Sequence, residues 1–222
     1  IQHTPDTPGQ TDKQPLHIPV LVGLVDKNGC DLEIDTPLLE LTQLQQSFVF
    51  KGIAQRPTPS LLRGFSAPVK LEFDFSQEQL LFLASKDSDS FNRWEAIQNL
   101  ALMLIHRLIA AYQAGQELSL EPSFIDACES LLQDRKQDKS LLAAALTLPS
   151  ERYIAETMDV VDPDAIHGVR EFMMTELAKA LRNSWLELYH ENNTQEQYTP
   201  VAEDIAERSL KNVCLAYLMR LD

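Results

Sequence analysis

The chain has 222 residues, of which 44% are apolar and 23% are charged, a composition typical of a globular protein that buries its core in one or two domains. Its formal net charge is −14 at pH 7, with a balance of −3 in residues 1–75 and −11 in residues 76–222. Such an acidic chain argues against a nucleic acid and against an anionic membrane as partners, because phosphate binding needs clustered Lys and Arg.

The first 75 residues carry the pattern of short strands. Alternating apolar residues predict a strand over 17–25, and the Asn28-Gly29 pair that follows predicts a tight turn. Further strands are expected over 38–44, 47–50, 60–65 and 68–75. About six short strands in this length predict a small β-sandwich.

From Ser76 onward the spacing of apolar residues changes to that of helices. A helix is expected from Ser90, as its N-cap, to Gln113, with Gly115 ending it. Pro122 suits the first turn of the next helix.

The later helices are marked by their start signals. Two short helices are expected over 140–147 and 150–157, separated by Pro149. Asp162 and Pro163 predict the start of the longest helix, which is expected to run to about residue 190. A last helix is expected to begin at Thr199-Pro200.

These elements together predict an α+β fold in two parts. Residues 1–75 are expected to form the small β-sandwich, as a linker domain, and residues 76–222 a helical domain. The helices differ in length and follow no fixed repeat, which is typical of an irregular, antiparallel, solenoid-like arrangement. The excess negative charge of the helical part allows two interpretations, a solvated surface or a cavity wall that attracts cationic peptide amines.

The cysteines indicate a reducing compartment. Cys30, Cys128 and Cys214 are odd in number, far apart and without a C-x-x-C pair, which favours free thiols over a disulfide framework. Cys128 and Cys214 lie on apolar helical faces and are expected in the core. No apolar run approaches the roughly 20 residues that span a bilayer, and no signal-peptide pattern precedes residue 30. We therefore expect a cytoplasmic protein.

Two polar groups could carry chemistry. Asp159, Asp162 and Asp164 form an acidic cluster, but they lack the glycine and distal Glu of a calcium loop, so N-capping by Asp162 explains them better. His106 is expected at the boundary of an apolar face, and His167 is expected to pair with Arg170 and Glu171 at helical spacing. Both histidines are thus interpreted as structural.

No other pattern in the sequence predicts a site. Trp94 and Trp185 stand among Leu and Ile at helical spacing and are expected to pack in the core. Neither a Gly-x-Ser-x-Gly motif nor a glycine-rich phosphate loop occurs. We predict that this sequence holds no catalytic residue, no cofactor-binding residue and no metal ligand.

Several segments, in order, point to a family. They are the window from Arg56 to Trp94 (RPTPSLLRGFSAPVKLEFDFSQEQLLFLASKDSDSFNRW), Thr4–Val20, Phe48–Phe50, Leu146–Ser150, Val161–Pro163 and Asp204–Arg208. Together they resemble bacterial aminopeptidase N, the zinc-dependent alanyl aminopeptidases of the gluzincin superfamily. The likeness covers nearly the whole chain and weakens only over 31–40. It implies the third, β-sandwich domain of that family and the first part of its helical fourth domain.

The resemblance also implies what this sequence lacks. The family binds zinc through a His-Glu-x-x-His helix and a second Glu, and it holds the substrate amine with a Gly-x-Met-x-Asn loop. Of the histidines only His190 precedes a Glu, and Thr194 stands where the second His would be needed. Without two imidazoles one helical turn apart, no zinc cradle is predicted.

The expected function follows from that resemblance. The chain is expected to be a non-catalytic fragment of an aminopeptidase that removes N-terminal residues from peptides. It would bridge to and roof the catalytic domain of the same polypeptide, with peptides as substrates and zinc as cofactor of the longer protein. The sequence starts at Ile1 and stops at Asp222 within a helical pattern, so we expect a piece of a longer protein. Since this piece lacks the zinc motif, we expect it to be inactive alone. A stand-alone protein-interaction module is the alternative.

Overall fold

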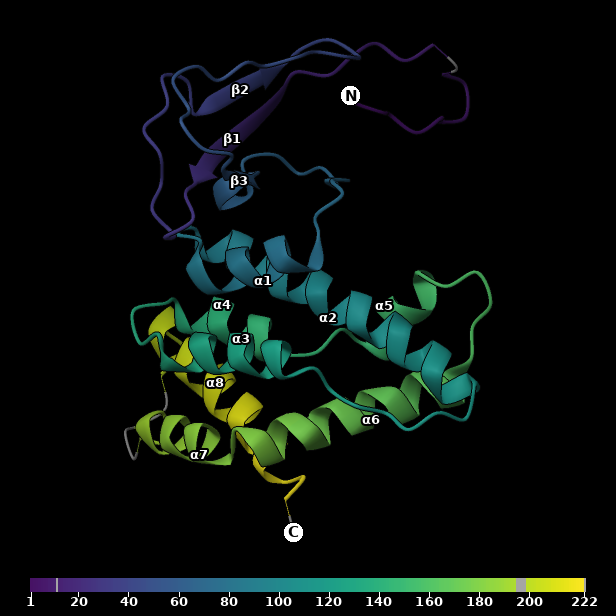
Figure 1. The fold of residues 1–222 in the computed structure, drawn as a ribbon, viewed down its shortest axis with the longest axis vertical. Coiled ribbons are helices and arrows are strands. Elements are labelled where there is room, and N and C mark those ends of the chain that lie inside the picture. The colour runs from purple at the N-terminus through teal and green to yellow at the C-terminus, as the bar shows by residue number, and fades with distance from the viewer. Residues whose placement is uncertain (11, 195–198, 222) are drawn as a thin grey trace. The chain divides into compact units, whose positions relative to one another are not determined.

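The structure is a computed structural model that describes residues 1–10, 12–194 and 199–221. Within these ranges it has three β-strands and eight α-helices (Figure 1). The chain divides into two compact units. The sheet unit comprises Ile1–Phe75 and Lys86–Asn92, and the helical unit comprises Ser76–Ser85 and Arg93–Asp222. The predicted α+β fold class is confirmed.

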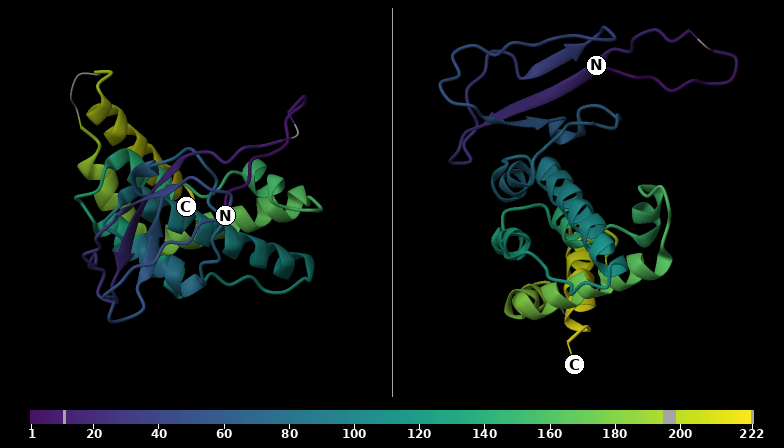
Figure 2. Two further views of the ribbon diagram at one scale, coloured as in Figure 1. Left: turned by 90° about the horizontal axis from the view of Figure 1, so that it is seen from above. Right: turned by 45° about the vertical axis from the view of Figure 1, so that its right-hand side comes forward.

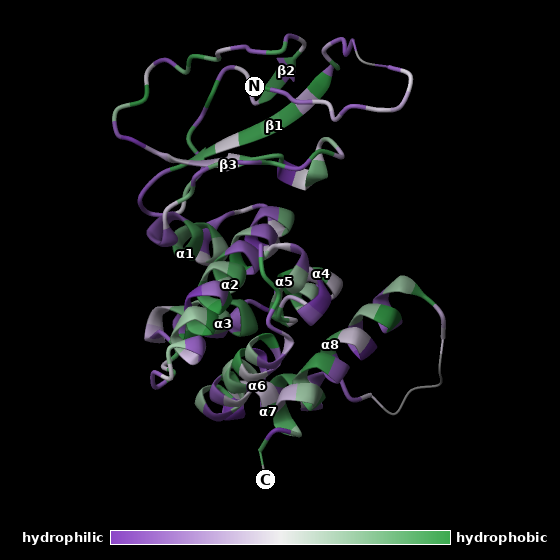
Figure 3. Cartoon of the chain, turned by 90° about the vertical axis from the view of Figure 1, so that its right-hand side faces the viewer, coloured by the Kyte–Doolittle hydropathy of each residue, from purple (hydrophilic) through white to green (hydrophobic). Residues whose placement is uncertain are grey.

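The sheet unit is built around one antiparallel sheet of order β2-β1-β3. Its strands are β1 (Ile18–Val25), β2 (Leu38–Leu41) and β3 (Thr58–Leu61), and both views of Figure 2 show β1 running beside β2. β1 is the central strand and is hydrophobic over most of its length (Figure 3). Its second half, Val22–Val25, is buried and pairs with β3, with Val22 opposite Leu61.

The predicted turn after β1 is confirmed. Gly29 has a φ of 88°, a left-handed conformation that costs glycine little. The Gly29 amide donates to the Asp26 carbonyl over 3.0 Å, and the Asp26 side chain accepts from the amides of Asn28 and Cys30. These bonds close the turn locally.

The number of predicted strands is wrong. Among the described residues, 47–50 and 68–75 form no strand, and β3 ends at Leu61 instead of continuing to residue 65. A strand requires a neighbour for its backbone groups, whereas the Val69 and Phe75 amides bond back to Ala67 and Phe73. Alternating apolar residues show only that a segment could present one apolar face as a strand. They do not show whether a neighbouring strand is there to pair with it.

The helices begin and end largely where the sequence indicates. Ser76 starts α1 with a capping box, since its hydroxyl accepts from the Gln79 amide and the Gln79 side chain accepts from the Ser76 amide. The helices are α1 (Gln77–Lys86), α2 (Ser90–Gln113), α3 (Pro122–Gln133), α4 (Lys139–Leu146), α5 (Glu151–Glu156), α6 (Pro163–Ala180), α7 (Arg182–Glu191) and α8 (Ala202–Leu218).

The ends of α2 show one confirmed prediction and one correction. Gly115, with a φ of 66°, follows the helix as predicted, and the next amide, of Gln116, bonds to the Ala111 carbonyl. The cap at the other end is Asp89, whose carboxylate accepts from the Asn92 amide over 2.9 Å, and not the predicted Ser90. Both residue types cap well, so local chemistry does not distinguish them.

The longest predicted helix is in fact two helices, α6 and α7, labelled separately in Figure 1. Leu181 leaves helical geometry between them, with φ −110° and ψ 21°. The indole of Trp185 lies one turn further on and donates to the Leu177 carbonyl over 3.1 Å. The indole is a second donor to this carbonyl, which also accepts from the Leu181 amide. It helps to stabilise the break, which apolar spacing alone does not reveal.

The helical unit has an apolar core of its own. Its largest fully buried side chains come from α2, α3, α5, α6 and α7 and include Ile97, Leu100, Phe124, Ile154, Met173 and Trp185. No helix in the described ranges combines the length and the apolar character that crossing a bilayer requires.

Candidate functional site

The histidines do not gather into a site in the described part of the chain. His17 contacts Glu40, His106 contacts Thr157 and His167 contacts Glu151. Across the described residues, no three or more His, Cys, Asp or Glu side chains are placed to hold a metal ion. These residues do not fit a zinc site, and we assign no chemical step through zinc to them. The prediction that the chain carries no catalytic, cofactor or metal residue stays a prediction.

Asp162 acts as the predicted N-cap. Its carboxylate accepts from the Ala165 amide over 3.0 Å and from the Gln113 side chain over 2.8 Å. The hydrogen bond from Gln113 has the larger effect and the one from the Ala165 amide the smaller, and both lower the pKa of Asp162 below its usual range. The interpretation of this acidic residue as a helix cap is therefore confirmed.

The predicted partners of His167 are wrong. Its Nδ1 lies 2.8 Å from Glu151 at the start of α5, while Arg170 donates to the Pro149 carbonyl and Glu171 pairs with Arg220. Helical spacing had placed three charged side chains on one face, but each finds a partner on another segment. His106, through its 2.9 Å contact with Thr157, likewise has a structural partner.

Trp185, Cys128 and Cys214 lie in the core, as predicted. The Trp185 ring stacks on Tyr217, with ring centroids 4.2 Å apart. Burial raises the pKa of both thiols to about 12, whereas Cys30 is exposed. Trp94 is half-buried. The raised pKa of the two buried thiols makes them poor nucleophiles.

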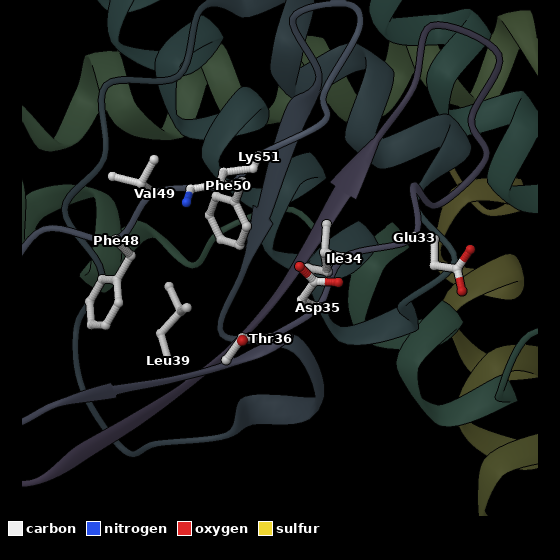
Figure 4. Close-up of a pocket in the computed structure, with 9 residues that line it drawn as sticks. All are labelled: Glu33, Ile34, Asp35, Thr36, Leu39, Phe48, Val49, Phe50 and Lys51. Atoms are coloured by element: carbon white, nitrogen blue, oxygen red, sulfur yellow. The ribbon is translucent and has the colours of Figure 1, made fainter.

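The sheet unit carries a surface pocket of about 350 Å³ beside β2 (Figure 4). Its apolar lining comes from Ile34, Leu39 and the run Phe48–Phe50, and Glu33, Asp35 and Lys51 add charge. In Figure 4 Leu39 lies close to Phe48, and the Glu33 carboxylate lies apart from the aromatic side chains. The size is within the range of ligand sites, and a mostly apolar lining with a few charged groups is suited to binding.

A second group of residues, which we call the Arg63 cluster, lies elsewhere in the sheet unit. The Arg63 guanidinium donates to Ser60 Oγ over 2.7 Å, to Asp31 Oδ1 over 2.6 Å and to Asp87 Oδ1 over 2.9 Å. Asn92 donates to the same Ser60 oxygen over 2.7 Å. Strand β3, the turn after it, the loop after β1 and the segment 86–92 therefore share one polar network.

The two carboxylates bound to Arg63 differ in their electrostatics. The hydrogen bond from Arg63 lowers the pKa of Asp31, which is partly exposed. Burial raises the pKa of Asp87, whose side chain is fully buried and whose Oδ2 has no hydrogen-bond partner. The two pKa values shift in opposite directions because desolvation is the largest effect on the fully buried Asp87, whereas the hydrogen bond from Arg63 is the largest effect on the partly exposed Asp31.

The sequence did not predict the Arg63 cluster. Arg63 and the Asp-Ser-Asp-Ser run at 87–90 are 24 residues apart at their nearest contact, and no motif links them. The available signals were a cation just after a strand and a polar run between two helices. Only the fold brings these signals together.

Two family models match the chain. Residues 77–222 match "Domain of unknown function (DUF3458_C) ARM repeats", and residues 1–74 match "Domain of unknown function (DUF3458) Ig-like fold".

Known proteins show the same likeness. Aminopeptidase N of Escherichia coli (strain K12) is 43% identical over 223 residues, covering 98% of this chain and 26% of that protein. Aminopeptidase N of Haemophilus influenzae is 38% identical, with the same coverage of 98% and 26%. The crystal structure of Legionella pneumophila aminopeptidase A in complex with aspartic acid matches 92% of this chain and 24% of that chain, with a TM-score of 0.76 and 32% identity. The chain thus spans about a quarter of the length of the relatives it matches.

Proposed function

Because the chain belongs to the DUF3458_C family of ARM-repeat domains, we propose that it is a non-catalytic part of a zinc-dependent aminopeptidase. This part has a structural role. Other parts of a longer polypeptide bind the zinc and supply the residues that act on the peptide. In that polypeptide the sheet unit bridges to the catalytic domain, and the helical unit roofs the cavity where peptides bind.

One observation carries the proposal. Nearly the whole chain, 98%, aligns with only 26% of aminopeptidase N of Escherichia coli, at 43% identity. A continuous match of this extent within a longer enzyme supports a role as one part of it. The sequence, which lacks the His-Glu-x-x-His pattern, supports a part other than the zinc-binding one.

The proposal has three finer elements. We divide the part into domains at residues 1–75 and 76–222, which the matches at 1–74 and 77–222 support. Its partners are the catalytic domain of the same polypeptide and, through it, peptides that lose their N-terminal residue. We place the enzyme in the cytoplasm, which the free cysteines support, since thiols persist in a reducing compartment.

The test is made on the purified 222-residue chain. After incubation with zinc and dialysis, we expect less than stoichiometric zinc by elemental analysis and no hydrolysis of an alanyl p-nitroanilide. Aminopeptidase N of Escherichia coli, treated in parallel, serves as the positive control and is expected to hold zinc and to turn over the substrate. Zinc-dependent turnover by the 222-residue chain would overturn the proposal.

The reading frame that contains this sequence gives a second test. We expect it to encode a His-Glu-x-x-His helix upstream of Ile1. A frame without that helix would contradict the aminopeptidase proposal and favour the interaction module.

A further inference from the structure

The guanidinium of Arg63 lies directly on the backbone of β1 at Gly23. A Cβ atom built on Gly23 would lie 2.0 Å from Arg63 Cζ and 2.4 Å from its Nε, far closer than atoms can approach. Gly23 is in a regular strand, so its backbone does not require glycine. The missing side chain instead leaves the space in which the guanidinium binds.

From that position Arg63 holds the segment 86–92, which comprises the last residue of α1, the connection 87–89 and the first turn of α2. It binds Asp87 directly, and Asp87 in turn accepts from the Asp89 amide over 3.0 Å. Asp89 accepts from the Gly64 amide over 3.0 Å, and Ser88 donates to Asp31 over 2.6 Å. The segment is therefore attached to the sheet unit mainly through polar groups that touch Arg63 or its neighbours.

The segment offers a single apolar side chain to this attachment. Phe91 is the one apolar side chain in the sequence of the segment 86–92, and its ring lies 5.2 Å from that of Phe65, centroid to centroid. Phe65 is itself half exposed. Without the polar network, a segment of this composition would bury too little apolar surface to stay ordered.

The backbone around Arg63 is unfavourable by itself. Leu62, Gly64 and Phe65 have φ values of 57°, 60° and 54°, and the left-handed region is costly for the two residues that are not glycine. Such geometry persists only where surrounding contacts hold it. The bonds of Arg63 and of the Gly64 amide are among these contacts, together with the burial of Leu62.

We propose that Arg63, seated on Gly23, is a latch: it keeps the α1–α2 connection bound to the sheet unit, and without it this connection opens while the sheet stays folded. Three carboxylates face the latch, from Asp31, Asp87 and Asp89, against the single guanidinium. Loss of Arg63 leaves the fully buried Asp87 without a compensating charge, and opening of the segment returns that carboxylate to water.

Hydrogen exchange of the 222-residue chain tests the latch. In Arg63→Met we expect the amides of residues 87–92 and of Gly64 to exchange at least ~100-fold faster, since an unpaired buried charge is strongly unfavourable. The amides of Val22 and Leu24 in β1 are expected to keep their protection. Arg56→Met, the same substitution at an exposed arginine of the sheet unit, is the matched control and should change neither group.

Gly23→Ala is an independent variant that retains the charge of Arg63 but removes its seat. We expect the same amides to exchange faster, by a smaller factor of about tenfold or more, because the charge of Arg63 is retained. Added to Arg63→Met, Gly23→Ala should have little further effect. Arg63→Met/Asp87→Asn, which removes both charges, should recover part of the protection. Two results would overturn the latch. One is an unchanged exchange rate of the amides of residues 87–92 in Arg63→Met and Gly23→Ala. The other is that, in both variants, the exchange rate of the β1 amides rises as much as that of residues 87–92.

Discussion

Tyr217 links three helices of the helical unit through one buried side chain. Its ring stacks on Trp185 of α7, and its hydroxyl donates to the Leu146 carbonyl at the end of α4 over 2.8 Å. Burial raises the pKa of its phenol well above the usual range, so the side chain stays a neutral donor. The bond satisfies a carbonyl that the end of a helix would otherwise leave unpaired.

Tyr217→Phe is therefore expected to lower the free energy of unfolding by about 1 to 2 kcal/mol, because it leaves the Leu146 carbonyl buried without a donor. Urea unfolding followed by circular dichroism measures the change. Tyr153→Phe, at a tyrosine that is 50% exposed, is the control and should have no effect. Equal stability of the two variants would show that the hydroxyl bond does not contribute.

The thiols give a second prediction at the scale of the residue. With a pKa of about 12, Cys128 and Cys214 hold almost no thiolate at pH 8. In the native chain a thiol reagent should quickly label only the exposed Cys30, and in denaturant it should label all three cysteines. Cys30→Ser should abolish the fast label, and rapid native labelling of Cys128 would contradict its position in the core.

At the scale of the element, Arg93 joins three helices. Its Nε donates to the Ala84 carbonyl in α1 over 3.0 Å, and its Nη1 donates to Asp134 at the end of α3 over 2.6 Å. Arg93 itself belongs to α2 and is only 7% exposed. The hydrogen bond from Arg93 lowers the pKa of Asp134, which couples this contact to pH.

Asp134→Asn is expected to lower the free energy of unfolding by about 1 kcal/mol at pH 7, because it removes a charge-assisted hydrogen bond. The pKa of Asp134 is lower in the folded chain than its usual 3.8, so its contribution is complete well above that pH and is lost as pH falls through the folded pKa. The difference between wild type and variant should therefore narrow from pH 7 to about pH 3. A difference that grows on acidification would contradict this sign.

At the scale of the whole molecule, the chain passes between its two units three times. It leaves the sheet unit after Phe75, returns for Lys86–Asn92 and leaves again at Arg93. The sheet unit is thus completed by residues that follow the first helix. The segment supplies Asp87 and Asn92, two of the buried polar side chains of this unit.

Chains of three lengths test this completion. Residues 1–92 should unfold cooperatively in urea, whereas residues 1–75 should show a lower midpoint or no transition, because they lack the partners of Arg63. Residues 1–85, which add α1 without the segment 86–92, should behave like 1–75. If 1–75 is as stable as 1–92, the predicted boundary at residue 75 is also the boundary of an independent folding unit.

Much of the helical part could be predicted from local patterns. Ser76, Gly115, Pro122 and Asp162 act through their own backbone or the next turn, so their effects are visible in the order of residues. The break at Leu181 was missed because it depends on Trp185 bonding to Leu177. In the sheet unit the alternating apolar residues at 68–75 predicted a strand. No strand forms there, because the segment has no neighbouring strand to pair with among the residues that the structure describes.

The order of amino acids alone determined the fold class, the turn at Gly29, most helix boundaries and the likeness to aminopeptidase N, since each rests on short-range spacing or on a linear match. Only the tertiary structure decided which alternating segments become strands and which carboxylates gather at Arg63. The carboxylates of Asp87 and Asp31 meet Arg63 across 24 and 32 residues, and strand pairing also joins segments that are distant in the sequence. At such separations burial and charge compensation, and not local preference, set the energy.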